Sequence, residues 1–276
     1  MEKKINSTAF DSSKDGQTIP PLFDVSGIRQ KHLDIQYSSV SPSQKLDIFL
    51  PESGSGQYPT LVHIHGGAFM LGDKRDIQIV PWLEALKHGY ALASINYRLS
   101  GEAIFPAAVC DAKNAIRFLR RNSAKYQLDG ERFAVVGGSA GGNISAMVSV
   151  TGDKSVFVEE QASGSESCAV KACVEWFGPT DFLKMDEQLA AAGLGPCDHS
   201  EKDSPESRYM GGQITTLESE WIQLANPMTY IHPGMPHMFI EHGSRDHIVP
   251  CMQSVMFVEK IRKELGYGCV QFEILQ

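Results

Sequence analysis

Long apolar segments are absent from this sequence of 276 residues. No stretch approaches the roughly 20 apolar residues that a membrane-spanning helix needs. The first residues, MEKKINSTAFDSSKDG, also lack the apolar centre of a secretory signal peptide. The sequence therefore predicts a soluble protein located in the cytoplasm, without a membrane span.

Positive charge is in short supply as well. The chain carries 25 Lys and Arg against 33 Asp and Glu, a formal net charge of -8. A nucleic-acid-binding protein requires a face rich in Lys and Arg to neutralise phosphates. The charge balance therefore disfavours a nucleic-acid partner, and nothing in the composition indicates an oligomeric state.

The six cysteines do not form any of the familiar motifs. None belongs to a C-x-x-C pair, and none stands beside histidine at zinc-finger spacing. Most lie in apolar surroundings, where a cysteine is usually a small buried hydrophobe. We expect a reduced, intracellular protein with no metal site.

Strand and helix patterns alternate along most of the chain. Strand patterns occupy residues 31–38, 45–51, 61–64, 90–99, 132–138, 169–178, 236–243 and 270–274. Helix patterns occupy residues 77–89, 105–126, 139–150 and 249–266. Such alternation predicts an α/β fold with a mostly parallel, twisted sheet and helices on both faces.

Two segments fall outside this alternation. Residues 1–30 are polar and are predicted to form an N-terminal arm or lid segment, so the main domain would span residues 31–276. Residues 184–221 have no strand pattern and contain several Gly, Pro and Ser. A long irregular stretch inside a compact domain is often functional, so we expect a cap-like insertion there, hereafter called the insertion.

The strongest chemical signal is VVGGSAGGN, residues 135–143, which contains the pattern G-x-S-x-G from Gly137 to Gly141. A strand pattern precedes it and a helix pattern follows, the context that this motif requires. Side chains at the two glycines would collide with neighbouring backbone in so sharp a turn. The turn projects Ser139 above the sheet, so we predict a nucleophile; the alternative is an ordinary serine helix cap.

A second glycine-rich turn, His65-Gly66-Gly67-Ala68, follows another strand pattern. Consecutive glycines allow backbone N–H groups to turn towards the negatively charged oxygen of a tetrahedral intermediate. The predicted oxyanion hole consists of Gly66, which permits the turn, and the N–H donors of Gly67, Ala68 and Ala140. A phosphate-binding loop is the alternative, but the Lys-Ser/Thr ending and third glycine are missing. His65 is expected to hold the turn rather than act as a base.

The predicted acid is Asp246, in EHGSRDHIVP, after a strand pattern and before a helix pattern. This position places it at the carboxyl end of a strand, where open α/β sheets bind ligands. Asp181, in GPTDF, is the second choice. A surface turn aspartate is the alternative reading of Asp246.

No general base can be assigned to a specific histidine. None of the nine histidines follows the last strand pattern. His247 adjoins Asp246, and consecutive residues in a turn usually point apart. His242 is expected to be buried at the end of its strand, and His199, in the insertion, would have to swing in. We therefore expect the catalytic histidine to lie beyond Gln276.

Taken together, several segments resemble the α/β-hydrolase carboxylesterases. They are HGGAF with GDK, NYRLS, FPAAVCDAKNAIRFLR, GGSAGGN, WFGPTDF, SPESRYMGG and HGSRDHIVP. The chain is most similar to the branch with bacterial acetyl-xylan and feruloyl esterases, near the hormone-sensitive-lipase group, from about residue 31 to Gln276. Ala68, in place of a third glycine, separates it from that group proper. The resemblance implies the α/β-hydrolase fold with Ser139 and Asp246 as triad members.

The resemblance also implies a catalytic histidine after the last strand and a final helix on the sheet, neither of which lies within the 276 residues. The implied activity is hydrolysis of small acyl esters, for example acetyl groups on carbohydrate, through an acyl-enzyme and without metal or cofactor. This chain would then be impaired. A non-catalytic ligand-binding homologue and an amidase or peptidase on the same fold remain as alternatives.

Overall fold

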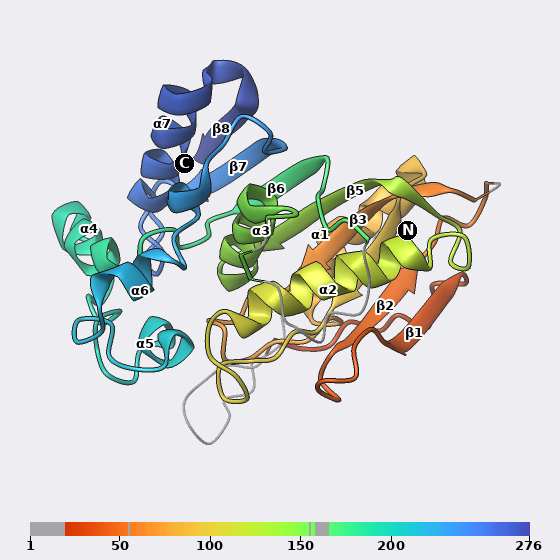
Figure 1. Cartoon of the computed structure of the whole chain (residues 1–276), viewed down its shortest axis with the longest axis horizontal. Coiled ribbons are helices and arrows are strands. Elements are labelled where there is room, and N and C mark those ends of the chain that lie inside the picture. Colours follow the sequence, from red (N-terminus) through yellow and green to blue (C-terminus); the bar gives the residue numbers. More distant parts are fainter. Residues whose placement is uncertain (1–19, 55, 155, 158–165) are drawn as a thin grey trace.

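The computed structural model describes residues 20–54, 56–154, 156–157 and 166–276. At its centre is an eight-stranded sheet with the order β1-β2-β4-β3-β5-β6-β7-β8 (Figure 1). The strands are β1 (Lys31–Gln36), β2 (Lys45–Phe49), β3 (Tyr58–Ile64), β4 (Ala91–Ile95), β5 (Leu128–Gly138), β6 (Ala172–Trp176), β7 (His237–Gly243) and β8 (Val270–Leu275). Only the β1–β2 and β2–β4 pairs are antiparallel among these strands, so the prediction of a mostly parallel sheet is confirmed.

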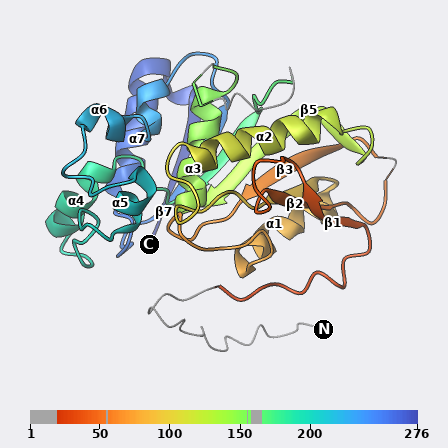
Figure 2. The ribbon, with the colours of Figure 1, turned by 60° about the horizontal axis from the view of Figure 1, so that its bottom comes forward.

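Helices cover both faces of the sheet, as predicted. The larger apolar cluster joins the sheet to α2 (Ala107–Arg121), α3 (Ala140–Thr151) and α7 (Met252–Leu265). The smaller cluster joins the opposite face to α1 (Val80–Leu83), mainly through Trp82. Figure 2 shows α1 on the other side of the sheet from α2 and α3. Short 3-10 helices complete the description: η1 (Ile77–Ile79), η2 (Glu84–His88), η3 (Phe182–Lys184), η4 (Pro227–Tyr230) and η5 (Tyr267–Cys269).

Helix α2 illustrates how the sequence pattern produces the packing. Its apolar positions recur every three or four residues, which places them on one face of the helix. This face is fully buried in the larger cluster; it consists of Ala108, Ala112, Ala115, Ile116 and Leu119. None of the described helices is both long and apolar enough to cross a membrane.

The prediction of one regular helix over residues 77–89 is wrong. The segment is divided into η1, α1 and η2. Pro81 lies in the first turn of α1, and because proline has no N–H it cannot continue the hydrogen-bond ladder from the preceding turn. Gly89, at a φ of 79°, ends the segment in the left-handed conformation.

The insertion contains three short helices, α4 (Met185–Ala192), α5 (Pro205–Met210) and α6 (Ser219–Gln223), and no strand. It contacts two loops at the carboxyl edge of the sheet. The ring of Tyr209 stacks on Phe69, after β3, with centroids 3.9 Å apart. A Cβ atom at Gly195 would lie 2.0 Å from the carbonyl oxygen of His247, after β7. The insertion therefore packs against the loops on either side of the candidate site.

The predicted N-terminal arm is described only in its last part, since residues 1–19 lie outside the described residues. Leu22 forms a β-bridge with Asp76, and the N–H of Phe23 donates to the carbonyl of Arg75 at 2.6 Å. Val25 is buried in the smaller apolar cluster. This part of the arm thus runs along the loop that follows β3.

Candidate active site

Ser139 occupies the sharp turn between β5 and α3. Its φ of 55° and ψ of -126° are unusual for a residue other than glycine. A Cβ at Gly137 would lie 2.5 Å from the carbonyl oxygen of Gly141, and a Cβ at Gly141 would lie 2.1 Å from that of Ile64. The backbone therefore admits only glycine at both positions, and the strand–turn–helix context predicted for the motif is confirmed.

The turn after β3 lies directly beside the Ser139 turn, because β3 and β5 are parallel neighbours with Ile64 paired to Gly137. A Cβ at Gly66 would lie 3.4 Å from Cβ of Ser139. The structure thus brings together the two glycine-rich motifs, which are more than 70 residues apart in the sequence.

The backbone of this second turn takes left-handed conformations, with φ of 121° at Gly67 and 55° at Ala68. Within the described part of the chain, no group accepts a hydrogen bond from the N–H of Gly67, Ala68 or Ala140. Unpaired N–H groups next to a serine hydroxyl can stabilise a developing oxyanion. The N–H of Gly66, by contrast, donates to Oε1 of Gln78 at 2.9 Å, so it is not available as an oxyanion donor. Gly66 is needed because it has no side chain.

His65 is buried beneath this turn. Its ring stacks on Tyr97 with centroids 4.5 Å apart, and Nδ1 lies 2.8 Å from the carbonyl oxygen of Gly66. Burial lowers the pKa of His65. These contacts are consistent with the structural role expected for His65, since a ring enclosed in this way cannot reach a substrate.

Asp246 lies in the turn that follows β7, at the same edge of the sheet as Ser139. Its Oδ1 accepts hydrogen bonds from the N–H groups of Ile248 and Val249, at 2.8 and 3.0 Å. Its Oδ2 lies 3.7 Å from Nε2 of His242. Asp181, the second choice, is half-buried after β6, and burial raises the pKa of its carboxyl group.

All nine histidines belong to the described residues, and none of them hydrogen bonds to Ser139. His242 uses both ring nitrogens, on the hydroxyl of Ser254 at 2.7 Å and the carbonyl of Val249 at 2.8 Å. Burial lowers its pKa. His199 is buried in the insertion, and the side chain of His247 is exposed.

Phe177 stands between the Ser139 turn and the turn that carries Asp246. Its ring would contact a Cβ at Gly138 at 3.1 Å and packs edge-on to His242 with centroids 6.3 Å apart. The residue has a φ of 42° and remains 37% exposed. A partly exposed aromatic ring thus packs against the residue that precedes Ser139.

Two polar residues next to the site were missed by the sequence analysis. Gln78 receives the N–H of Gly66, while its own Nε2 donates to Oδ2 of Asp76 at 2.9 Å. Glu175, in β6, is fully buried beneath the first turn of α3, and its Oε1 accepts the N–H of Gly178. An acidic residue inside the apolar stretch ACVEWFG was a sequence signal for Glu175. No sequence pattern points to Gln78.

Burial raises the pKa of Glu175 to about 8, against the smaller opposing effect of the Gly178 hydrogen bond. Its Oε2 has no hydrogen-bond partner among the described residues. Burial therefore favours the protonated, neutral form of this carboxyl group. A neutral carboxyl group at Glu175 does not offset the partial positive charge at the N-terminus of α3. This charge then favours an anion at Ser139.

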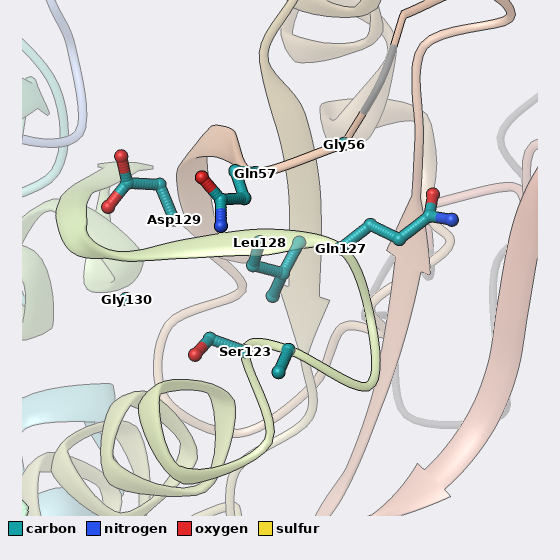
Figure 3. A pocket seen from close by; sticks show the side chains of 8 residues that line it. Gly56, Gln57, Ser123, Gln127, Leu128, Asp129 and Gly130 are labelled. Atoms are coloured by element: carbon teal, nitrogen blue, oxygen red, sulfur yellow. The ribbon is translucent and has the colours of Figure 1, made fainter.

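A cavity of about 370 Å³ lies elsewhere (Figure 3). It is lined by Gly56, Gln57, Ser123, Ala124, Gln127, Leu128, Asp129 and Gly130. Leu128 begins β5, whereas Ser139 follows its end, so this cavity is at the opposite edge of the sheet. Among the described residues, no cluster of three or more His, Cys, Asp or Glu could hold a metal ion.

Comparisons with known proteins identify similar esterases. The BD-FAE family model matches residues 46–261. The chain is 28% identical over 233 residues to LipM, a probable carboxylic ester hydrolase of Mycobacterium tuberculosis, and 29% identical over 242 residues to esterase LipQ of the same organism. These alignments cover 83% and 87% of this chain but 51% and 54% of the two relatives. The chain thus spans about half the length of the curated relatives it matches.

Two solved structures are similar over most of the chain. A bifunctional GH43-CE protein of Bacteroides eggerthii superposes with a TM-score of 0.76 at 32% identity, covering 89% of this chain and 34% of that one. A truncated carbohydrate esterase from gut microbiota has a TM-score of 0.76 at 29% identity, covering 92% and 90%. The α/β-hydrolase fold expected from the sequence is confirmed.

Proposed function

The chain belongs to the BD-FAE family, and we propose that it forms the catalytic part of a serine carboxylesterase. The observation that carries the proposal is the packing of Gly66 against Ser139. The N–H groups of the next two residues, Gly67 and Ala68, have no acceptor among the described residues, which supports an oxyanion hole in this turn. A hydroxyl nucleophile and N–H donors for the oxyanion are two of the elements that acyl transfer requires, besides a general base.

In the proposed reaction, Oγ of Ser139 loses its proton to a base and attacks the ester carbonyl. The N–H groups of Gly67, Ala68 and Ala140 hold the resulting oxyanion, and each such donor lowers the barrier by about 2.7–4 kcal/mol. The alcohol then leaves with a proton, and the acyl group stays on Ser139. Water attacks the acyl-enzyme, releases the carboxylic acid and restores the hydroxyl.

We assign the triad acid to Asp246 and the base to none of the nine histidines, because those near Asp246 have their ring nitrogens engaged elsewhere or point to solvent. Loss of the histidine in a serine hydrolase costs on the order of 10⁶ in turnover. We therefore propose that these 276 residues by themselves hydrolyse esters very slowly.

For the substrate, we propose a small acyl group esterified to carbohydrate. The two similar solved structures, one named as a carbohydrate esterase and one as a GH43-CE protein, support this class. The insertion adds support, since it contacts the loops on both sides of Ser139 through Tyr209 and Gly195. We propose that it acts as the cap that shapes the alcohol side of the site.

Free imidazole provides the test, because a soluble base can replace a missing histidine. Hydrolysis of p-nitrophenyl acetate is measured against imidazole concentration, with an enzyme-free blank subtracted, for the parent chain, Ser139→Ala and Ser123→Ala. Ser123 lines the distant cavity of Figure 3 and serves as the matched control. The expected result is an imidazole-dependent rate in the parent and in Ser123→Ala that is absent from Ser139→Ala.

Other results have defined meanings. Equal rates in the parent and Ser139→Ala would reject Ser139 as the nucleophile and support the non-catalytic ligand-binding alternative. A fast, Ser139-dependent rate without imidazole would reject the assignment of the base. Acetate release from acetylated xylo-oligosaccharides, compared with an acetanilide, then separates the carbohydrate esterase from an amidase.

A further inference from the structure

The loop between β7 and α7, residues 244–251, is called the acid loop here because it carries Asp246. The carboxylate of Asp246 is oriented by the backbone of its own loop, through the N–H groups of Ile248 and Val249. Any displacement of these two peptide groups would turn the carboxylate. The position of Asp246 therefore depends on what holds residues 248 and 249 in place.

Two buried histidines contact the carbonyl groups of those same residues. Nε2 of His242 lies 2.8 Å from the carbonyl oxygen of Val249, and Nε2 of His199 lies 2.8 Å from that of Ile248. His242 comes from the adjoining strand β7, only a few residues away. His199 comes from the insertion, 49 residues before Ile248, so it ties two separate parts of the fold together.

The surroundings of His199 determine its protonation. A carbonyl oxygen can only accept, so Nε2 must carry a proton. Nδ1 lies 3.1 Å from Oε2 of Glu206, and both side chains are more than nine-tenths buried. The contact is not aligned as a hydrogen bond, and we treat it as an ion pair. In a neutral ring with its proton on Nε2, the lone pair of Nδ1 would face the carboxylate of Glu206, and the two would repel each other.

Charge therefore favours the protonated ring. Burial by itself would lower the pKa of His199, but the carboxylate of Glu206 outweighs it and the pKa is raised. Asp186 of α4 adds to the negative surroundings, since its two carboxylate oxygens accept the N–H groups of His199 and Ser200, each at 2.9 Å. Glu206 and Asp186 are the acidic groups that face His199 from α5 and α4.

We propose that His199, in its charged form, is a positioning residue that fixes the acid loop, and with it Asp246, to the insertion. The proposal rests on the proposed role of Asp246 in ester hydrolysis. It also accounts for a histidine near the acid that cannot be the base, because both ring nitrogens are engaged away from Ser139. The insertion would then act on catalysis by holding the acid, besides covering the site.

Amide hydrogen exchange tests the loop directly and does not require activity. The N–H groups of Ile248 and Val249 are followed in the parent, His199→Asn and His199→Gln, with His237→Gln as control. A glutamine amide can reach the place of Nε2 and donate to the Ile248 carbonyl, whereas asparagine is too short. His237 is exposed at the opposite end of β7.

In His199→Asn, exchange of both amides should be at least about tenfold faster relative to their intrinsic rates, because a hydrogen bond from a charged donor is lost. Exchange in His199→Gln and His237→Gln should stay within about threefold of the parent, by the same reasoning. Protection should fall with rising pH in the parent but not in His199→Gln, because only the histidine loses a proton. Equal protection in the parent and His199→Asn, with β7 amides unchanged, would overturn the proposal.

If His199→Asn does not fold, the pH comparison between the parent and His199→Gln decides alone; identical pH profiles would overturn the proposal. The imidazole-supported ester hydrolysis is then measured on the same proteins. A loss of kcat in His199→Asn that His199→Gln restores supports the positioning role. Absence of Ser139-dependent hydrolysis in every variant would reject the proposed function, while the exchange results would still decide whether His199 holds the loop.

Discussion

The N–H of Gly66 donates a hydrogen bond to Oε1 of Gln78 at 2.9 Å, immediately beside the candidate nucleophile. Oε1 of Gln78 and Cβ of Ser139 both lie within 3.4 Å of the position that a Gly66 Cβ would take. The other end of the amide is held by Asp76, whose carboxylate accepts both the Gln78 side chain and its backbone N–H, each at 2.9 Å. Gln78 thus fixes the peptide plane that precedes Gly67 and Ala68, the two proposed oxyanion donors of this turn.

Replacing Gln78 with alanine should lower the imidazole-supported kcat about tenfold and leave KM almost unchanged. The lost hydrogen bond, worth about 0.5–1.5 kcal/mol, orients donors that act in the transition state. Gln30→Ala is the matched control, because its side-chain amide also hydrogen bonds to backbone, at Pro51 and Glu52, ahead of the edge strand β1. A rise in KM at constant kcat would instead mean that Gln78 contacts the substrate.

A methyl group at position 141 should destabilise the fold, because α3 approaches β3 too closely to accommodate it. Alanine inside a helix normally stabilises by about 1 kcal/mol relative to glycine, but here its Cβ would lie 2.1 Å from the carbonyl oxygen of Ile64. We expect Gly141→Ala to lower the free energy of unfolding by about 3 kcal/mol or more, measured by urea denaturation. Gly101→Ala, which has open space around its Cβ position, should change it by less than about 0.5 kcal/mol. Equal stabilities would contradict the close approach of α3 to β3.

Glu175 should make stability depend on pH in a defined direction. Burial raises its pKa to about 8 in the folded chain, from an ordinary value of 4.5. Between these values the folded state keeps a proton that the unfolded state releases, so the contribution of Glu175 to stability is greatest below pH 4.5 and is lost as pH rises towards 8. The slope is about 1.4 kcal/mol per pH unit for one proton.

Glu175→Gln replaces the titrating carboxyl group with a neutral amide. The free energy of unfolding of the variant, relative to the parent, should therefore increase by about 1.4 kcal/mol per unit between about pH 5.5 and 7.5. Urea denaturation across this range is the measurement, and Glu259→Gln, on the exposed side of α7, is the control. Parallel pH profiles for Glu175→Gln and the parent would show that the carboxyl is ionised throughout.

A buried charge network should hold the loop after β3 to the edge of the sheet. Asp47 is fully buried, with its carboxylate 3.5 Å from Nζ of Lys74 and in contact with the guanidinium of Arg75. Asp47→Asn should lower the free energy of unfolding by about 3 kcal/mol, because the buried positive charge of Lys74 then loses a neighbouring negative charge. Asp203→Asn, whose exposed side chain pairs with Arg208 at 3.7 Å, should cost less than about 1 kcal/mol. A loss of similar size in both variants would argue against the network.

Much of the architecture could be predicted because it follows from local patterns. The buried face of α2 comes from spacing alone, and so does the alternation of strands and helices that produces the sheet. The division of residues 77–89 into three short pieces could not be predicted with the same ease. There, Pro81 interrupts the backbone hydrogen bonds, and the periodic pattern of side chains does not record that interruption.

Some features of the candidate site could likewise be predicted from the sequence, and others could not. The turn around Ser139 could be predicted from the sequence, because crowding between backbone segments leaves glycine as the only choice at Gly137 and Gly141. The sequence also predicted that Asp246 follows a strand, since strand patterns can be counted along the chain. These are properties of a few consecutive residues and their backbone conformations.

The polar groups that support those residues became known only from the three-dimensional packing. Gln78 meets Gly66, and His199 meets Ile248, across loops whose approach depends on the packing of the whole sheet and insertion. The depth of Glu175 beneath α3, and hence its neutral charge, likewise depends on all the layers around it. Hydrogen-bond partners and burial are set by distances in space, and a linear pattern of residue types contains no record of them.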